Sequence, residues 1–582
     1  MNKLFLRLAT TASFAILLTL LNACGEHKKQ FEFAGGTFAT CIDNEPNSFI
    51  ARNVTDIYSF QMISQIMEGL VSFNPDDLSL QPQLAKSWKV SDEGDVFTFT
   101  IRDDVYFHNH EMFSSESDRL MTMEDVLYSF EKSCKPNEEG NPSEAYLNLF
   151  QNQLKGAKEF FEGKSKSISG IKINGNTIEF TLINPDFNYV DKLANLNASI
   201  VSKKVDGSNA DNKLVGTGPF YYDRLVNKEE GKYILLKNQD YYLFDNKGNA
   251  LPYLDTVLFY VQPRKLEQLE MFEQGQIQLI SELPTSRITE MLESHMVDFN
   301  SQPPLMILYN NPLLITQYYF FNMQDERFKD VRVRKAFNYA IDRERLANNV
   351  LRNQFYEYGI YGITPPINSI FKGYDFSEIK KNGYQFNPTL AKKLLAEAGY
   401  PNGKGFGNVD LRLDVRDLNT AVADEFAQQI AEILGINVNI DGSDFVQRVA
   451  DEKLGKGDMF RAAWIADYAS PETYLNNFYG KLVPTDPKDP SPLNISRYNN
   501  PQFDTYLEDA RKSSRKDKNK LLLKAEIELM QNPPIIPLWY ANNYIISYSK
   551  VRNLKNNPMQ FLDLKQVYIK SWTKEEYLKT LK

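Results

Sequence analysis

Residues 460–475 read FRAAWIADYASPETYL. The apolar first half is typical of a buried strand, and Asp467 follows it together with the turn residues Ser470 and Pro471. A carboxylate therefore lies where a predicted strand ends. In open α/β sheets the ligand crevice lies beyond the carboxyl ends of the strands. We therefore expect Asp467 to meet a cation there, namely the ammonium group of a ligand.

A strand, helix and strand precede this stretch. Residues 409–415 alternate as a strand does, residues 420–434 have helical spacing, and residues 436–440 alternate again. Such a unit is expected to be parallel and right-handed. Arg416 follows the first of these strands, so it should lie at the same sheet edge as Asp467. One crevice with both signs of charge suits a zwitterionic ligand.

An earlier part of the chain has a different character. Residues 96–101 and 171–182 show strand patterns, the second around an Asn-Gly turn. Between them, Thr122 and Asp125 have the spacing of a capping box that begins a helix. These features predict a small α+β insertion, whereas alternating helices and strands follow Pro303-Pro304.

The N-terminus is typical of a secretory signal. A basic start precedes the apolar run 8–21, which is too short to span a bilayer. The run ends in LNAC, residues 21–24, which resembles a bacterial lipobox with cleavage before Cys24 and acyl chains on that residue. An ordinary signal peptide with an incidental cysteine is the alternative. The rest of the chain is expected outside the cytoplasmic membrane, with the lipid as its membrane contact.

The charge and length of the chain exclude one class of partner and indicate more than one lobe. Loss of residues 1–23 removes two basic side chains and moves the formal charge from −9 to −11. Nucleic acid is therefore an unsuitable partner, because counterion release requires a basic surface. The roughly 560 residues that remain are too many for one hydrophobic core, so two or more lobes are expected. Whether Cys41 and Cys134 form a disulfide stays open.

Two motifs that suggest other chemistry are incomplete. His108, His110 and Glu111 lie within HNHE, which we interpret as an exposed turn rather than a metal site. Residues 163–165 resemble the end of a P-loop, but Lys158 stands where that motif requires glycine. No nucleophile with a base and no HExxH motif is visible. We therefore predict no enzyme activity, no metal and no cofactor; a surface hydrolase and a structural or chaperone-like protein are the alternatives.

Seven segments spread over nearly the whole chain carry a family resemblance. They are QIMEGL from Gln65, QPQLAKSWKVSDEGDVFTFTIRDDVYFHN from Gln81, MEDVLYSF from Met123, GTGPFYYDRL from Gly216, FKDVRVRKAFNYAIDRERL from Phe328, AKKLLAEAGY from Ala391 and WIADYASPETYL from Trp464. In this order they resemble the extracellular solute-binding proteins of dipeptide and oligopeptide ABC transporters, family 5, the large three-domain class. Residues 110–120 depart from the family pattern, and we interpret them as an insertion in a surface loop.

The resemblance implies an α/β, periplasmic-binding-protein-like (Venus-flytrap) fold with mixed sheets. Two lobes close over the ligand, and an extra α+β domain extends one of them. The division it implies is a signal peptide (1–23), a lipid-anchored tether (24–35), lobe I (36–67, 200–314 and 543–582), an additional domain inserted in lobe I (68–199) and lobe II (315–542).

The resemblance also implies a function. A lipid-anchored monomer would capture short peptides by hinge closure and deliver them to the permease of an ABC importer. The alternative is the same scaffold binding a non-peptide solute such as an oligosaccharide, an opine, haem or a nickel complex. A dependence of binding on a free α-amino group distinguishes the two.

Site residues follow from the same resemblance. Asp467 would pair with the α-ammonium of the peptide, and the main chain at Ala463 and Ile465 would pair with an extended peptide as an added strand does. One of two arginines would bind the ligand carboxylate, because guanidinium does so bidentately; otherwise each is a surface charge. The candidates are Arg416 and Arg461 for the carboxylate, and Trp464 and Tyr468, which also suit an ordinary core, for a side-chain pocket.

Overall fold

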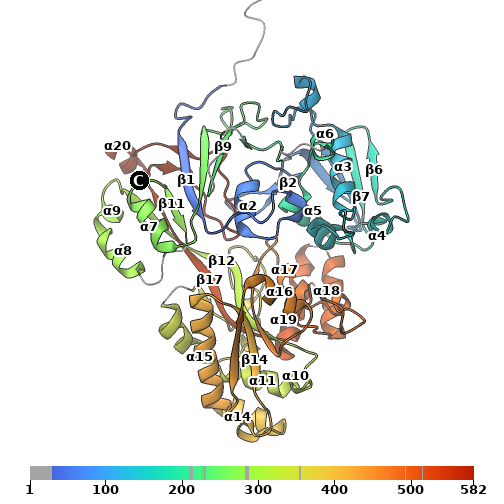
Figure 1. Ribbon diagram of the computed structural model, residues 1–582, viewed down its shortest axis with the longest axis vertical. Helices are drawn as coiled ribbons and strands as arrows, with labels where there is room; N and C mark the ends of the chain where they lie inside the picture. The colour runs from blue at the N-terminus through green and yellow to red at the C-terminus, as the bar shows by residue number, and fades with distance from the viewer. Residues whose placement is uncertain are drawn as a thin grey trace, which may run out of the picture.

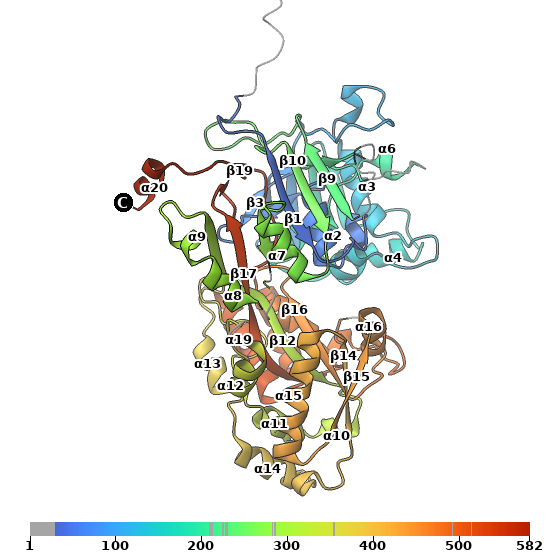
Figure 2. The same ribbon diagram turned by 60° about the vertical axis from the view of Figure 1, so that its left-hand side comes forward.

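The computed structural model describes residues 29–581, apart from 209–213, 224–225, 227–230, 282, 284–286, 353–354, 492 and 514. Two long strands, β12 (Met306–Phe321) and β17 (Ile535–Tyr548), run side by side from an upper into a lower half (Figures 1 and 2). In the described ranges no helix is long and apolar enough to cross a bilayer. The predicted signal peptide and Cys24 lie outside the described residues, so their roles stay predictions.

One mixed sheet of eleven strands extends through both halves. Its order is β15-β14-β16-β12-β17-β11-β1-β10-β9-β8, with β13 paired to β17. Its shorter strands are β1 (Thr37–Ile42), β8 (Phe220–Tyr222), β9 (Lys232–Lys237), β10 (Thr256–Val261), β11 (Leu279–Ser281), β13 (Glu357–Tyr358), β14 (Val409–Asp414), β15 (Val438–Ser443) and β16 (Met459–Ile465).

The ladder between β12 and β17 is irregular where the chain passes from one half to the other. Its register shifts between Pro312 and Thr316 and again between Gln317 and Tyr318. Proline cannot donate to a ladder, so pairing is interrupted at this point. We propose that this irregular segment is the hinge between lobes I and II, whose predicted boundary at residue 315 falls within it.

A second sheet lies beside the upper half and belongs to residues 68–199, called the side domain below (Figure 1). Its strands, in the order β4-β5-β7-β6, are β4 (Ala85–Val90), β5 (Val96–Ile101), β7 (Thr177–Thr181) and β6 (Ile171–Asn174), and a separate pair is β2 (Val71–Phe73) with β3 (Leu80–Pro82). Helix α3 (Met123–Ser133) begins with the predicted capping box of Thr122 and Asp125. Phe97, Phe130 and Phe180 pack in the core between this sheet and that helix. The predicted α+β character is confirmed.

The lower half contains the predicted strand, helix and strand unit. β14 and β15 are parallel, with Val409 opposite Val438, and α15 (Asp417–Leu434) connects them. Helix α14 (Pro388–Glu397) begins with Asn387 as its N-cap and Pro388 in its first turn. The other helices of this half are α10 (Glu326–Lys329), α11 (Val331–Ala340), α12 (Arg343–Leu346), α13 (Phe376–Lys381), α16 (Phe445–Lys453), α17 (Glu472–Leu475), α18 (Pro501–Lys512) and α19 (Arg515–Gln531).

The remaining helices surround the upper half and the side domain. They are α2 (Ile57–Ile63), α4 (Ala157–Phe161), α5 (Tyr189–Leu193), α6 (Lys203–Asp206), α7 (Lys265–Glu273), α8 (Ile288–Ser294), α9 (Met296–Asn300) and α20 (Lys574–Thr580).

Cysteine and histidine residues that drew attention in the sequence have structural surroundings. Cys41 and Cys134 are free thiols, and burial raises the pKa of the Cys41 thiol to about 12. His108 is buried and bonds through Nε2 to the main-chain oxygen of Gly218 at 2.9 Å. The interpretation of this histidine as part of an exposed turn is therefore wrong, because its ring connects two main-chain segments.

Candidate functional site

Residues 460–475 span the end of β16 and the start of the next helix. β16 stops at Ile465, α17 begins at Glu472, and the loop between them carries Asp467. β14 and β16 are parallel neighbours, paired at Leu411–Met459 and Arg412–Phe460. Their carboxyl ends therefore share one edge of the sheet, as predicted from the order of the elements.

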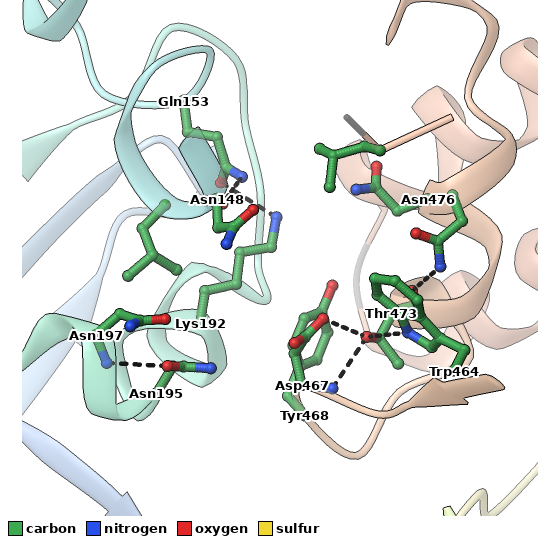
Figure 3. Close-up of a pocket in the computed structure, with 13 residues that line it drawn as sticks. Asn148, Gln153, Lys192, Asn195, Asn197, Trp464, Asp467, Tyr468, Thr473 and Asn476 are labelled. Atoms are coloured by element: carbon green, nitrogen blue, oxygen red, sulfur yellow. Dashed lines mark hydrogen bonds between the residues drawn. The ribbon is translucent and has the colours of Figure 1, made fainter. Parts of the chain in front are cut away.

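A cavity of about 110 Å³ lies between this loop and the side domain (Figure 3). The wall from the side domain consists of Asn148, Leu149, Gln153, Lys192, Asn195 and Asn197. The wall from the lower half consists of Trp464, Asp467, Tyr468, Thr473, Asn476, Asn477 and Leu493. Each wall belongs to a different part of the chain, so the size of this space depends on how the side domain and the lower half are placed relative to each other.

A single hydroxyl group fixes the carboxylate of Asp467. The Thr473 hydroxyl donates to Asp467 Oδ2 at 2.9 Å and accepts from the main-chain N–H of Asp467 at 3.2 Å. The same oxygen accepts from Nε1 of Trp464 at 3.4 Å. Thr473, which no sequence pattern marks as a site residue, therefore orients both the acid and the indole that line the cavity (Figure 3).

The electrostatic surroundings of Asp467 favour the binding of a cation. Its side chain is open to the cavity, but protein from both walls surrounds it. Burial raises the pKa of this carboxyl to about 6, while the Thr473 hydrogen bond and the charge of Lys192 oppose the rise. Within the described ranges Asp467 is not part of any ion pair. A carboxylate in this position is stabilised by a ligand that brings a positive charge.

Lys192, on helix α5, is the cation on the opposite wall. Its Nζ lies 2.5 Å from Oδ2 of Asp186 and donates to Oε1 of Gln153 at 3.1 Å. Figure 3 shows the side chain projecting from the side domain toward the cavity. The charge of Lys192 is therefore largely satisfied by its own domain.

Across the cavity, Glu472 is fully buried at the start of α17. Its carboxylate lies 3.0 Å from Nε of Arg511 and 2.8 Å from Nζ of Lys518. Burial alone would raise the pKa of Glu472, but the charges of Lys518, Lys192 and Arg511 hold it well below its usual range. This group of charges is likewise satisfied within its own domain.

Asn188 connects the two domains beside the cavity. Its side-chain N–H group donates to Oε2 of Glu472 at 2.8 Å and to Oγ of Ser470 at 3.3 Å. Between the charges around Lys192 and those around Glu472, the described residues form one ion pair across this boundary. It joins Lys518 and Asp186 at 4.0 Å. A neutral amide therefore makes the closest polar contact between the walls.

The two predicted arginines lie elsewhere. Arg416 has a side chain that is 63% exposed and an Nε 3.0 Å from Asp414. Arg461 donates to Oε1 of Gln317 at 2.7 Å and lies 3.6 Å from the same Asp414. Neither lines the cavity at Asp467, where the opposing cation is Lys192. No local sequence pattern marks Lys192, since its position opposite Asp467 arises from domain packing.

The strand that leads into the site has one open edge. Ala463 pairs with Gln317 and Ile465 with Ile315, both on β12. On the other side, β14 pairs with β16 only as far as Phe460, and no strand of the described chain continues that ladder. The main-chain oxygen of Arg461 accepts from Nη1 of Arg448 at 3.0 Å. Residues 462–465 therefore offer main-chain groups on that edge, as strand addition by an extended ligand requires.

Comparisons with known proteins identify the family. Residues 79–484 match the model of bacterial extracellular solute-binding proteins, family 5. The dipeptide-binding protein DppE of Bacillus subtilis is 24% identical over 573 residues, which cover 96% of this chain and 97% of the relative. Heme-binding protein A of Haemophilus influenzae is 25% identical over 588 residues, covering 96% and 98%.

A solved structure agrees in fold. The periplasmic binding protein DppA of Helicobacter pylori, in complex with the peptide STSA, has 26% identity and a TM-score of 0.75, covering 92% of this chain and 99% of its own. The multi-domain α/β architecture with mixed sheets is thus the periplasmic-binding-protein fold predicted from the sequence. Proteins of this kind bind solutes outside the cytoplasm for ABC transporters and are not enzymes. The chain belongs to family 5 of the bacterial extracellular solute-binding proteins.

Proposed function

We propose that this protein captures short peptides in the cleft between its domains and delivers them to the permease of an ABC importer. The observation that carries the proposal is the place of the Asp467 carboxylate, which lies on an interdomain cavity and is not part of any ion pair within the described chain. Burial raises the pKa of this carboxyl to about 6. A peptide supplies the missing positive charge through its α-ammonium group. A charge-assisted hydrogen bond to a carboxylate is among the strong polar interactions available in such a site.

The remaining contacts follow from the same placement. The open edge at Ala463 and Ile465 binds the peptide main chain, which gives affinity without selecting side chains. Trp464 and Tyr468 line the space next to the ammonium group. Because contacts come from both walls, the ligand favours the closed arrangement, which the permease recognises.

One of the two arginines, Arg416 or Arg461, binds the carboxylate end of the ligand. Arg461 is committed to Gln317 and is mostly buried. Arg416 is more exposed, so it can turn from Asp414 toward a ligand without leaving a buried charge behind. Arg416 is therefore the better candidate of the pair.

The cellular arrangement is part of the proposal. The LNAC sequence supports acylation of Cys24, which holds a monomer at the membrane surface near its permease. Metabolic labelling with a fatty acid tests this point: label in the wild type and none in Cys24→Ala is the expected result, and equal labelling of the two contradicts it.

A non-peptide solute is the second candidate, because a relative with 25% identity over most of the chain is named for binding haem. Native mass spectrometry of residues 25–582, followed by denaturation, identifies whatever co-purifies. A series of peptide masses, displaced by added peptide but not by its N-acetylated form, supports peptide capture. A single non-peptide mass moves the function to the second candidate.

Substitution of Asp467 tests its assigned role. Asp467→Asn keeps the size of the side chain but removes the charge, so we expect peptide affinity to fall roughly 30-fold or more, as on loss of one partner of a buried charge pair. Asp509→Asn, an exposed carboxylate on α18, is the matched control and should change nothing. Calorimetric titration with one tripeptide measures both, and unchanged affinity in Asp467→Asn contradicts the role.

A further inference from the structure

Six of the thirteen residues that line the cavity at Asp467 carry side-chain amides. Three of these retain hydrogen-bonding capacity in the described structure. Asn195 uses Oδ1 to accept the main-chain N–H of Asn197 at 3.0 Å, and Asn476 uses Oδ1 to accept from Nη2 of Arg511 at 2.5 Å, so both amide nitrogens stay available. Asn148 is exposed, and neither its amide oxygen nor its amide nitrogen has a hydrogen-bond partner among the described residues.

The position of the ligand ammonium group determines which part of the ligand contacts these amides. The ammonium nitrogen would lie about 2.8 Å from the Asp467 carboxylate. Its carbon is about 1.5 Å further on and carries both the main chain and the first side chain. The main chain is expected to follow the open edge of β16, which leaves the cavity of about 110 Å³ for the first side chain.

Charge narrows the class of side chain that fits. Asp186 and Gln153 already satisfy Lys192, so the wall has little free positive charge to attract an acidic side chain. The same ammonium repels a basic side chain. An uncharged side chain is left, and the available amides provide donors and acceptors for a hydroxyl or a carboxamide.

We propose that this cavity is the specificity pocket for the first side chain of the ligand, where Asn148, Asn195 and Asn476 select an uncharged hydrogen-bonding group over an aliphatic one. This inference rests on the proposed function, since it requires the ammonium group on Asp467. An aliphatic side chain displaces water from the amides without replacing its hydrogen bonds, which lowers affinity.

An isosteric pair of peptides tests the selection. Thr-Ala-Ala and Val-Ala-Ala differ by a hydroxyl in place of a methyl group, and calorimetric titration of the mature protein measures both. We expect the threonine peptide to bind roughly 3- to 10-fold more tightly, the range expected for one or two hydrogen bonds. Equal affinity, or preference for valine, overturns the inference while leaving peptide capture intact.

Two variants assign the selection to particular residues. Asn148→Leu should bring the threonine-to-valine ratio close to one, whereas the control Asn152→Leu, an exposed amide on the same segment outside the cavity, should keep it. Asn195→Asp keeps the oxygen that accepts the Asn197 N–H and adds a negative charge. It should therefore raise the affinity for Lys-Ala-Ala relative to Thr-Ala-Ala.

The outcomes distinguish a failure of the specificity pocket from a failure of peptide capture. Ratios that stay at the wild-type value in both cavity variants overturn the pocket. If Asn148→Leu does not melt cooperatively, Asn195→Asp decides the matter by itself. If no tripeptide with a free amino group binds the wild type, peptide capture fails, and the specificity pocket fails with it.

Discussion

Two groups of charged residues lie near the candidate site, and they are arranged differently. The cross-cleft group consists of the charged residues Asp186, Lys192, Glu472, Arg511 and Lys518, together with the neutral Asn188. The arginine group consists of Asp414, Arg416, Arg448, Glu452 and Arg461. The first spans the side domain and the lower half, between which we propose that the ligand binds, whereas the second lies within the lower half.

The difference indicates how a binding cleft can contain buried charges and still open. In the cross-cleft group each domain satisfies its own charges, Lys192 with Asp186 and Lys518 with Glu472, so separation leaves none of them without a partner. The closest polar contact between the domains comes from the neutral Asn188. In the arginine group three guanidinium groups share Asp414 inside one domain, which fixes the end of β14.

The largest expected effect comes from breaking the pairing inside one domain. Glu472→Gln leaves Arg511 and Lys518 without their buried partner, so we expect the free energy of unfolding of the lower half to fall by roughly 3–5 kcal/mol. Urea denaturation measures the change. Glu124→Gln, which removes an exposed pair with Lys203, is the control and should cost less than about 1 kcal/mol. Similar losses in both variants would contradict the difference between the groups.

A second test uses pH to separate the cleft from the arginine group. In the free protein the carboxyl of Asp467, with its pKa raised to about 6, is protonated below that value. A bound ammonium requires the ionised form, so affinity should be full above pH 6 and should fall up to about tenfold per unit as the pH decreases further. It should fall again above about pH 8, where the peptide amino group loses its proton.

A control variant is needed because burial raises the pKa of Glu452, in the arginine group, to about 7, which is close to the pKa of Asp467. Glu452→Gln should preserve the decline of affinity below pH 6, whereas the residual binding of Asp467→Asn should lack it. A decline that follows Glu452 instead would transfer the pH dependence to the arginine group.

A third test addresses the neutral connection between the domains. Asn188→Ala removes the hydrogen bonds to Glu472 and Ser470 without altering any charge. We expect peptide to dissociate roughly 5- to 20-fold faster. The hydrogen bond to the charged Glu472 forms only when the domains are closed, so its removal destabilises the closed form alone. Stopped-flow fluorescence measures the rate, with Asn174→Ala on the distant β6–β7 hairpin as the control. An unchanged rate would show that Asn188 does not stabilise closure.

The smallest effect is expected from Arg416. Its side chain is 63% exposed, so Arg416→Ala should change the free energy of unfolding by less than about 1 kcal/mol. If it meets the ligand carboxylate, affinity for a free peptide should fall while affinity for the same peptide with an amidated C-terminus stays constant. Equal loss for both peptides would remove Arg416 from the site.

Local patterns predicted much of the scaffold. The β14–α15–β15 unit and the capping box at Thr122 depend on nearest neighbours along the chain, and the structure has both. The apolar residues between Tyr58 and Leu70 have helical spacing, but helix α2 ends at Ile63. Ile66, Met67 and Leu70 are buried all the same, so their apolar character reflects the core rather than a helix face.

The sequence by itself determined the family, the order of the elements and the place of Asp467 after a buried strand. These follow from periodicity, turn chemistry and short motifs, all of which act over a few residues. The tertiary structure alone decided that Lys192 and the amides of the side domain face Asp467 across nearly three hundred residues of chain (Figure 3). It also decided that Asn188 donates to Glu472. Their placement depends on how two separate hydrophobic cores pack against each other, and no local pattern encodes that arrangement.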